Sequence, residues 1–261
     1  HKLMALIKKF RIKKFKLEET VLKLDKISMF YNKRQILSNL SLNIYKQEIL
    51  GMLGPNGVGK STIFHIITGL KEPSYGKVLI KGQDCTNTPV YDRATKFNLG
   101  YVPQYGGFIQ DLNLIDNLKL VAEIHIEEKN LRKIKIDKLI SQFEFEPLLK
   151  IKAKYLSGGQ KKKLVIAMAL INDPSILLLD EPFAALDILT IKMLQAIIVN
   201  LQSVEKITVI VCDHQARDLL SCVDRAIVLS NGKIIASGSP SEIIKDNSAR
   251  SAYFGDEFKI N

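Results

Sequence analysis

The chain has 261 residues, of which 46% are hydrophobic, enough to form the core of one large α/β domain or of two closely packed lobes. No apolar run approaches the roughly 18 residues that a membrane-spanning helix needs, because charges interrupt each run after a few positions. The three cysteines form no C-x-x-C pair and indicate neither a disulfide framework nor a zinc site, so a reducing cytosol is expected.

The net charge of +11 is concentrated near the N-terminus. Seven lysine and arginine residues precede the first acid, Glu18, and the rest of the chain carries only +4. We interpret residues 1–20 as a basic tail, in which residues 1–3 precede Met4 and were added for expression. Three interpretations fit the mixture of apolar and cationic residues at positions 5–17: an amphipathic helix on an anionic membrane, a nucleic-acid contact, or a solvated tail.

Alternating patterns predict the strands. Residues 21–44 predict short strands around a turn at residues 32–35, and residues 76–84 predict another, which together form a small antiparallel layer. Asn231 and Gly232 predict a hairpin turn. Apolar runs predict further strands at residues 48–53, 175–182, 207–214 and 225–238.

The stretch between these strand groups predicts helices. Residues 114–143 have helical apolar spacing throughout and no glycine, so residues 105–172 are predicted to form an inserted helical lobe. The fold class is therefore α/β: a mostly parallel sheet with helices on both faces, an antiparallel β layer and a helical subdomain. Residues 21–261 are interpreted as one domain.

The stretch GPNGVGKST, residues 54–62, matches the phosphate-loop pattern G-x-x-x-x-G-K-[ST]. A predicted strand precedes it and a predicted helix follows, so its backbone amides and the helix N-terminus would face an anion. Lys60 would reach the outer phosphates, and the Ser61 hydroxyl would be a ligand of Mg²⁺. The residues predicted to hold the nucleotide are Gly54, Pro55, Asn56, Gly57, Gly59, Lys60, Ser61 and Thr62.

A second apolar strand, ILLLDE, ends in two acids. Ligands of open α/β sheets bind at the carboxyl ends of the strands, which is where Asp180 and Glu181 are predicted to lie. Asp180 is a candidate for holding Mg²⁺, and Glu181 for accepting the proton of an attacking water. These acids favour an NTPase over a passive nucleotide binder.

The segment LSGGQ, residues 156–160, precedes a predicted helix and is called the signature segment below. Ser157 is a suitable N-cap, and the exposed amides of Gly158, Gly159 and Gln160 make a second predicted phosphate site. If both sites cannot reach one nucleotide within a monomer, the second serves a nucleotide held by a partner.

Along the chain, the phosphate loop comes first, then the signature segment, then ILLLDE, and this combination resembles the ATP-binding cassette ATPases that drive membrane transporters, whose fold is of the phosphate-loop NTPase type. The resemblance extends from about Leu22 to the C-terminus. It implies that two ATP molecules lie between two copies of the chain, each held by Lys60 of one copy and the signature segment of the other. It further implies an adenine-stacking aromatic at Tyr31 and an interface aspartate at Asp187.

The resemblance also implies a switch histidine, His214, that contacts the γ-phosphate, and a glutamine, Gln104, that senses both Mg²⁺ and this phosphate. The groove after Gln104 would receive a permease helix, with Phe108 as the candidate contact. The sequence departs from the family at Gln47, where glycine is usual, and this is expected to alter only a turn. Val165 and Met168 replace a usual acid and arginine.

The C-terminal residues 248–260 and the stretch DEPFAALD resemble those of the ATPase subunits of lipopolysaccharide export systems. This resemblance implies two permease subunits and a location on the cytoplasmic face of the inner membrane. The alternatives are the ATPase of a branched-chain amino acid importer and a cassette protein that acts on nucleic acid or ribosomes. The latter usually carries two cassettes, whereas this chain has one phosphate loop, so no nucleic acid is expected as a partner.

Overall fold

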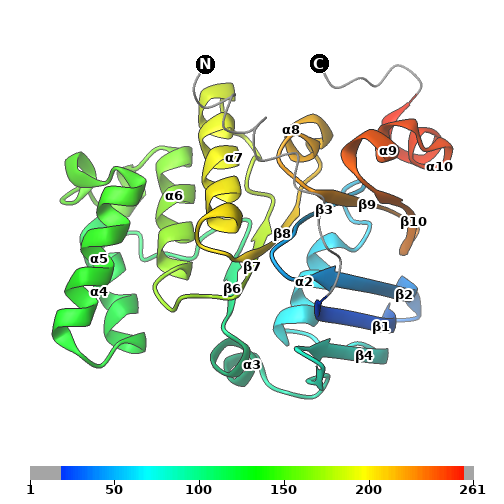
Figure 1. The fold of residues 1–261 in the computed structure, drawn as a ribbon, viewed down its shortest axis with the longest axis horizontal. Coiled ribbons are helices and arrows are strands. Elements are labelled where there is room, and N and C mark those ends of the chain that lie inside the picture. Colours follow the sequence, from blue (N-terminus) through cyan, green and yellow to red (C-terminus); the bar gives the residue numbers. More distant parts are fainter. Residues whose placement is uncertain (1–18, 256–261) are drawn as a thin grey trace.

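The computed structural model describes residues 19–255. The predicted tail, up to residue 18, and the last six residues of the chain lie outside the described residues. Two sheets and two groups of helices make up the fold (Figure 1). Three cysteines occur in the sequence, and all three are free and buried.

The first sheet is antiparallel, with the strand order β2-β1-β4-β5. Its strands are β1 (Thr20–Tyr31), β2 (Arg34–Tyr45), β4 (Tyr75–Ile80) and β5 (Gln83–Asp84). The predicted turn at residues 32–35 is shorter than expected, because only Asn32 and Lys33 have positive φ, 42° and 67°, and β2 starts directly after them. Two consecutive positive φ values give the turn that matches the twist of a hairpin.

The second sheet has six strands in the order β10-β9-β3-β8-β7-β6, and all its neighbours are parallel except β9 and β10. The strands are β3 (Ile49–Leu53), β6 (Leu99–Val102), β7 (Ile176–Asp180), β8 (Thr208–Cys212), β9 (Arg225–Ser230) and β10 (Lys233–Gly238). The predicted hairpin is confirmed, with φ of 48° at Asn231 and 71° at Gly232.

Every residue of β3, β7 and β8 is buried, because both faces of this sheet are covered. Alternate residues contribute to two cores. Leu177 and Leu179 pack toward the helical lobe, whereas Ile176 and Leu178 pack toward the antiparallel sheet and the helix after the phosphate loop. Figure 1 shows the antiparallel sheet and the helical lobe on different sides of the central strands.

The longer helices are α2 (Lys60–Thr68), α3 (Val90–Phe97), α4 (Leu114–His125), α5 (Lys129–Phe143), α6 (Gly158–Ala169) and α7 (Ile188–Ser203). The shorter ones are α8 (Ala216–Leu220), α9 (Pro240–Lys245), α10 (Asn247–Ala249), η1 (Glu146–Leu148), η2 (Ala153–Tyr155) and η3 (Arg250–Phe254). The prediction of helix throughout residues 114–143 was wrong at one point. Ile126 is extended, with φ −125° and ψ 110°, and α4 and α5 are separate helices.

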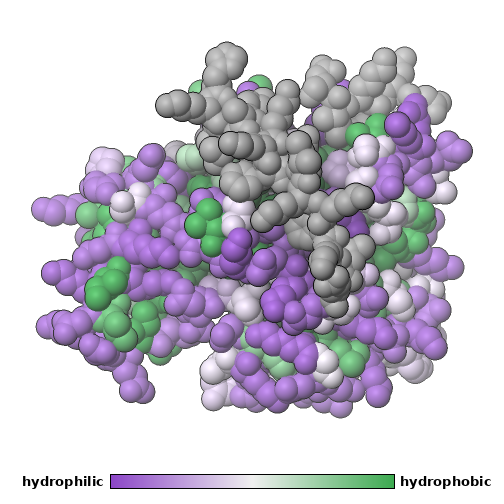
Figure 2. Space-filling view, viewed as in Figure 1, coloured by the Kyte–Doolittle hydropathy of each residue, from purple (hydrophilic) through white to green (hydrophobic). Residues whose placement is uncertain are grey.

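The unusual residue Gln47 does occupy a turn, as predicted, with φ of 58°. Its amide N–H donates to Thr208 Oγ1 across 2.8 Å, and its carbonyl accepts from Gln202 Nε2 across 2.6 Å. The turn is therefore tied to β8 and α7. No helix within residues 19–255 is long and apolar enough to cross a bilayer. Most of the face in Figure 2 is hydrophilic, and its apolar patches are separate.

Candidate functional site

The phosphate loop joins β3 to α2, as the pattern predicted. Gly54 and Gly59 have φ of 154° and 111°, values that L side chains rarely adopt. A Cβ at Gly54 would lie 2.8 Å from the carbonyl oxygen of Leu229, and one at Gly59 would lie 2.8 Å from Leu37 Cδ2. The chain can take this path only with glycine at these two positions.

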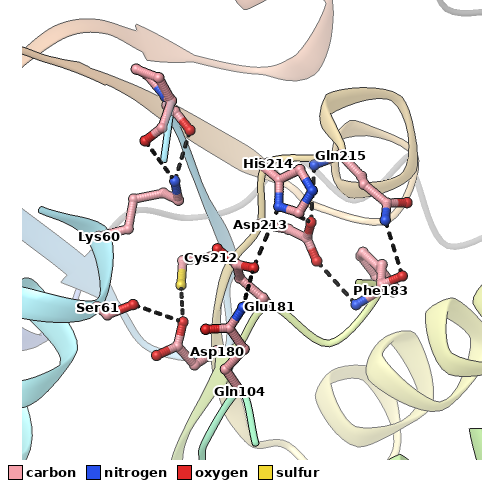
Figure 3. Close-up of polar contacts among 12 residues, drawn as sticks. Lys60, Ser61, Gln104, Asp180, Glu181, Phe183, Cys212, Asp213, His214 and Gln215 are labelled. Atoms are coloured by element: carbon pink, nitrogen blue, oxygen red, sulfur yellow. Dashed lines mark hydrogen bonds and ion pairs between the residues drawn. The ribbon is translucent and has the colours of Figure 1, made fainter. Parts of the chain in front are cut away.

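Lys60 is the first residue of α2, and its side chain points back over the loop (Figure 3). Only 4% of its surface is exposed. Its Nζ donates hydrogen bonds to the carbonyl oxygens of Gly54, across 2.7 Å, and Pro55, across 3.0 Å. The ammonium group thus lies within the phosphate loop rather than in bulk solvent.

Asp180 and Glu181 lie at the carboxyl end of β7, next to α2, as predicted. The Ser61 hydroxyl donates to Asp180 Oδ1 across 3.2 Å, which joins the two candidate magnesium ligands (Figure 3). Glu181 has a φ of 46°, and its amide donates to the carbonyl of Cys212 across 2.8 Å. A left-handed backbone conformation is uncommon for residues other than glycine. Where such residues adopt it, they are often part of a functional site.

Two further predicted residues converge on the Glu181 carboxylate (Figure 3). Gln104 Nε2 donates to Glu181 Oε2 across 2.7 Å, and His214 Nδ1 lies 3.4 Å from the same oxygen. Gln104 follows β6, and its backbone carbonyl accepts from Lys162 Nζ on α6 across 2.7 Å. Glu181 is 9% exposed, and the His214 side chain is 39% exposed, so His214 is the more accessible of the two.

Asp213, which the sequence analysis did not single out, holds this group in place. It is fully buried, and its carboxylate accepts hydrogen bonds from the amides of Phe183, across 3.0 Å, and Gln215, across 2.9 Å. Burial raises the pKa of Asp213, although these two amides act to lower it. Asp213 therefore ties the loop after β7 to the loop that carries His214 (Figure 3). The sequence signal that could have revealed Asp213 is its position directly after the buried strand β8.

The signature segment opens α6 through a capping box. Gln160 N–H donates to Ser157 Oγ across 3.3 Å, and Ser157 N–H donates to Gln160 Oε1 across 2.9 Å. Gly158 and Gly159 form the first turn, and a Cβ at Gly159 would lie 2.4 Å from Thr190 Cγ2 on α7. Within residues 19–255, no hydrogen bond joins the signature segment to the phosphate loop.

Asp187 is the N-cap of α7, and its carboxylate accepts from the Thr190 amide across 3.0 Å and from the Thr190 hydroxyl across 2.5 Å. These hydrogen bonds lower the pKa of Asp187. The next two residues are strongly exposed, Ile188 at 71% and Leu189 at 78%. Asp187 therefore stands at an open surface beside the signature segment, because Thr190 contacts both.

Tyr31 and Phe108, the two predicted aromatic contacts, lie in different settings. Tyr31 ends β1, is 41% exposed, and has Lys71 Nζ 4.4 Å above its ring. Phe108 is partly buried and packs against the core of the helical lobe. The open apolar residues beside Phe108 are Tyr105, at 81% exposure, and Ile109, at 48%.

The residues present fit a magnesium ion bound together with phosphates. Mg²⁺ prefers hard oxygen ligands and is usually held by one or two protein groups, with waters and phosphate oxygens completing the octahedron. Ser61 and Asp180 supply one hydroxyl and one carboxylate side by side. Within the described part of the chain, no group of three or more His, Cys, Asp or Glu side chains could hold a metal without such help.

The fold and this site define a phosphate-loop ATPase with a helical lobe. Comparison with known proteins agrees: the family described as ABC transporter matches residues 37–184. An ATP-binding cassette of an ABC transporter, MJ1267, superimposes with a TM-score of 0.82 at 25% identity, over 90% of this chain and 99% of that one. The cassette MJ0796, in a dimeric post-hydrolysis state bound to ADP and Pi, gives a TM-score of 0.75 at 29% identity, over 84% of this chain and 98% of that one.

Curated relatives point the same way. An uncharacterized ABC transporter ATP-binding protein of Rhizobium meliloti is 37% identical over 88% of this chain and 84% of its own length. The lipopolysaccharide export system ATP-binding protein LptB of Haemophilus influenzae is 34% identical over 92% of this chain and 100% of its own length. The chain belongs to the ABC transporter family: it is an ATP-binding subunit that hydrolyses ATP to ADP and phosphate to energise a transporter, and its predicted fold class is confirmed.

Proposed function

We propose that Glu181 is the general base of ATP hydrolysis and takes a proton from the water that attacks the γ-phosphate. The observation that carries this proposal is the convergence of Gln104 and His214 on one oxygen of Glu181, 2.7 and 3.4 Å away, beside Ser61 and Asp180. A general base must lie within hydrogen-bond reach of the proton that it removes, and neighbouring polar groups fix its direction.

The other residues hold and orient the nucleotide. Lys60, whose Nζ lies within the loop at the carbonyls of Gly54 and Pro55, and the backbone N–H groups of the phosphate loop would bind the phosphates. Ser61, Asp180 and Gln104 would hold Mg²⁺, which would neutralise charge on the phosphates. His214 contacts the γ-phosphate, and Tyr31 stacks on the adenine at its exposed position at the end of β1.

The second predicted phosphate site, the signature segment, serves the nucleotide that is bound by the phosphate loop of a second copy of the chain. The signature segment and Asp187 share Thr190 as a neighbour, and they have no hydrogen bond to the phosphate loop of their own chain within residues 19–255. In an ATP-bound homodimer, each nucleotide would lie between the Lys60 of one copy and Ser157, Gly158, Gly159 and Gln160 of the other. Closure of this dimer does the mechanical work, and hydrolysis resets it.

Two membrane permease subunits receive that work through the surface that follows Gln104. Phe108 itself packs inward, so Tyr105 and Ile109 supply the open apolar area beside it. Exposed apolar patches of this kind are typical of protein interfaces. The chain would then lie on the cytoplasmic face of the inner membrane through its partners.

The cargo that we propose is lipopolysaccharide, extracted from the inner membrane. Support comes from the LptB relative of Haemophilus influenzae, whose whole length this chain covers, and from LptB of Escherichia coli, 33% identical over 88% of this chain and 95% of its own length. The C-terminal resemblance adds to this, although only residues 248–255 of that segment are within the described residues. Tyr253 of this segment donates to the carbonyl of His214 across 2.7 Å.

Affinity capture tests the cargo. The Glu181→Gln variant, with ATP and Mg²⁺, is incubated with detergent-solubilised native membranes, and the retained proteins are identified. Recovery of lipopolysaccharide-export permeases supports the proposal. Recovery of amino-acid permeases or ribosomes instead would agree with an ATPase but contradict lipopolysaccharide as the cargo. A Lys60→Ala variant, which cannot bind the phosphates, is the control and is expected to lose every ATP-dependent partner.

A further inference from the structure

Two residues outside every predicted motif, Tyr101 and Cys212, contact the carboxylate of Asp180 from opposite sides. The Cys212 thiol donates to Oδ1 across 2.9 Å (Figure 3), and the Tyr101 hydroxyl donates to Oδ2 across 3.3 Å. Tyr101 lies on β6 and Cys212 on β8, the two strands that flank β7. Each oxygen of Asp180 therefore has a donor from a neighbouring strand.

The register of the sheet explains why Cys212 contacts Asp180. Cys212 pairs directly with Asp180 across β8 and β7, so the two side chains leave the sheet on the same face. Cys212 is fully buried and Asp180 is 2% exposed, so few waters can reach the carboxylate. A buried charge without hydrogen-bond partners is costly, and its partners also fix its orientation.

Tyr101 also links this strand to the helix of the phosphate loop. Its ring makes edge-to-face contacts with Phe64 and His65 of α2, with ring centroids 6.3 Å apart in both pairs. Helix α2 carries Ser61 in its first turn, and Ser61 donates to the same carboxylate. One side chain thus contacts both elements that supply the candidate magnesium ligands.

We propose that Tyr101 and Cys212 are positioning residues that fix the carboxylate of Asp180 relative to Ser61, so that both oxygens are set for the Mg²⁺ of bound ATP. This inference rests on the magnesium site of the proposed function. Outer partners of metal-binding carboxylates commonly tune metal affinity about 10- to 100-fold. Neither residue needs to touch the nucleotide for this effect.

The test uses Tyr101→Phe, which keeps the ring, together with Cys212→Ala and Cys212→Ser. A fluorescent, non-hydrolysable ATP analogue is bound to the full chain, first with EDTA and then as Mg²⁺ is titrated. The Mg²⁺ midpoint is expected to rise about tenfold in Tyr101→Phe and Cys212→Ala. Affinity without Mg²⁺ is expected to stay within about twofold, because both donors act on the metal-binding carboxylate.

Cys212→Ser separates the donor from the packing. Its hydroxyl can donate where the thiol did, so its Mg²⁺ midpoint is expected to stay within about threefold of the wild-type value. Cys222→Ala removes another buried thiol, which donates to the carbonyl of Leu219, and Tyr91→Phe alters a tyrosine that is 74% exposed. Both controls are expected to keep the wild-type midpoint.

Unchanged midpoints in Tyr101→Phe and Cys212→Ala would overturn the inference. So would an equal loss of affinity with and without Mg²⁺, or a Cys212→Ser midpoint as high as that of Cys212→Ala. If the analogue bound the wild-type chain equally well with EDTA and with Mg²⁺, the magnesium site itself would be wrong and the inference would fail with it. A normal Mg²⁺ response in the wild type alongside unchanged variants would overturn the positioning role alone.

Discussion

At the scale of single residues, Glu181 is the proposed general base, and its neighbours restrict the direction of its carboxylate. Gln104 donates to one of its oxygens, His214 stands beside the same oxygen, and its backbone φ of 46° turns it out of the strand. A conformation of this kind is retained where the surroundings over-determine it. The backbone and Gln104 thus fix the direction of this buried side chain.

Replacement of Glu181 by glutamine keeps the shape of the side chain and removes the base. Turnover of ATP is expected to fall by about 10²- to 10⁴-fold, the range for a positioned general base, while ATP binding is retained. Phosphate release under saturating ATP and equilibrium binding of a fluorescent nucleotide measure the two quantities. Glu205→Gln, at a surface ion pair with Lys138, is the matched control and is expected to keep full turnover. Wild-type turnover in Glu181→Gln would remove Glu181 from the mechanism.

Local sequence revealed some of these residues and not others. Asp180 and Glu181 could be predicted because a run of buried aliphatic residues ends at them, and Lys60 and Ser61 because the glycine spacing marks their loop. Tyr101 and Cys212 carry no such mark, and Asp213 was not singled out although it follows a buried strand, as the two acids of β7 do. Their contacts arise from the order of β6, β7 and β8, which are separated by long helical segments in the chain. Long-range strand pairing is not visible in a local pattern.

At the scale of elements, Arg93 of α3 holds the C-terminal end of α2. Its guanidinium is fully buried and donates to the carbonyls of Ile66, Ile67, Thr86 and Thr88 across 2.6 to 3.1 Å. A cation at the C-terminus of a helix also interacts favourably with the helix dipole. Burial lowers the pKa of Arg93, so these four carbonyls must compensate the charge.

Arg93→Ala would remove a donor from each of these four carbonyls and leave a cavity where the guanidinium was buried. The free energy of unfolding is expected to fall by about 3 kcal/mol, which corresponds to a decrease of about 6–12 °C in the melting temperature of a chain of this size. Calorimetry measures the change. Lys96→Ala, on the same helix but exposed, is expected to leave the melting temperature nearly unchanged. A similar loss in both variants would show that α3 itself, rather than the Arg93 contacts, is what matters.

Two helices begin with the same capping box, and only one of them belongs to the proposed site. Ser157 caps α6 and Ser239 caps α9. In each helix the side chain of the third residue, Gln160 or Glu242, accepts a hydrogen bond from the backbone N–H of the capping serine. Substitution of either serine by alanine is expected to cost about 1 kcal/mol of stability. ATP turnover is expected to fall only in Ser157→Ala. Unfolding midpoints and phosphate release in the two variants separate the structural role from the functional one.

The elements were predicted best where the turn chemistry is strong. Asn231 and Gly232 marked their hairpin, because both residue types accept positive φ readily. Asn32–Lys33 and Lys81–Gly82 form similar turns with weaker signals, so one boundary was misplaced and β4 and β5 were taken as one strand. The break between α4 and α5 contains neither glycine nor proline, and apolar spacing alone could not reveal it.

At the scale of the whole molecule, the proposed site is complete only in a dimer. Mixing two inactive variants tests this. In a dimer of one Lys60→Ala chain and one Ser157→Ala chain, one composite site has both defects and the other has none. An equal mixture is therefore expected to recover about a quarter of wild-type turnover, because half of the dimers are mixed and each has one intact site. Sites formed within single chains would give no recovery above the sum of the separate variants.

The fold as a whole could be predicted because three phosphate-site segments occur in a fixed order, with strands and a helical lobe between them. The composite nature of the site was suggested only by the presence of two phosphate-binding helix ends. The family match and the dimeric relative bound to ADP and Pi agree with the class of assembly. The phosphate-binding segments do not indicate the cargo, and only the C-terminal segment and the stretch DEPFAALD suggested one.

The burial of all three cysteines gives this chain a practical property. Cys85, Cys212 and Cys222 are 1%, 0% and 6% exposed, so thiol-reactive dyes should leave the native protein unlabelled. A cysteine introduced at an exposed position, such as Tyr75 on the antiparallel sheet or Lys129 on the helical lobe, would then be the reactive one. Movement between sheet and lobe during turnover can thus be followed by energy transfer without first removing Cys212 from its place beside Asp180.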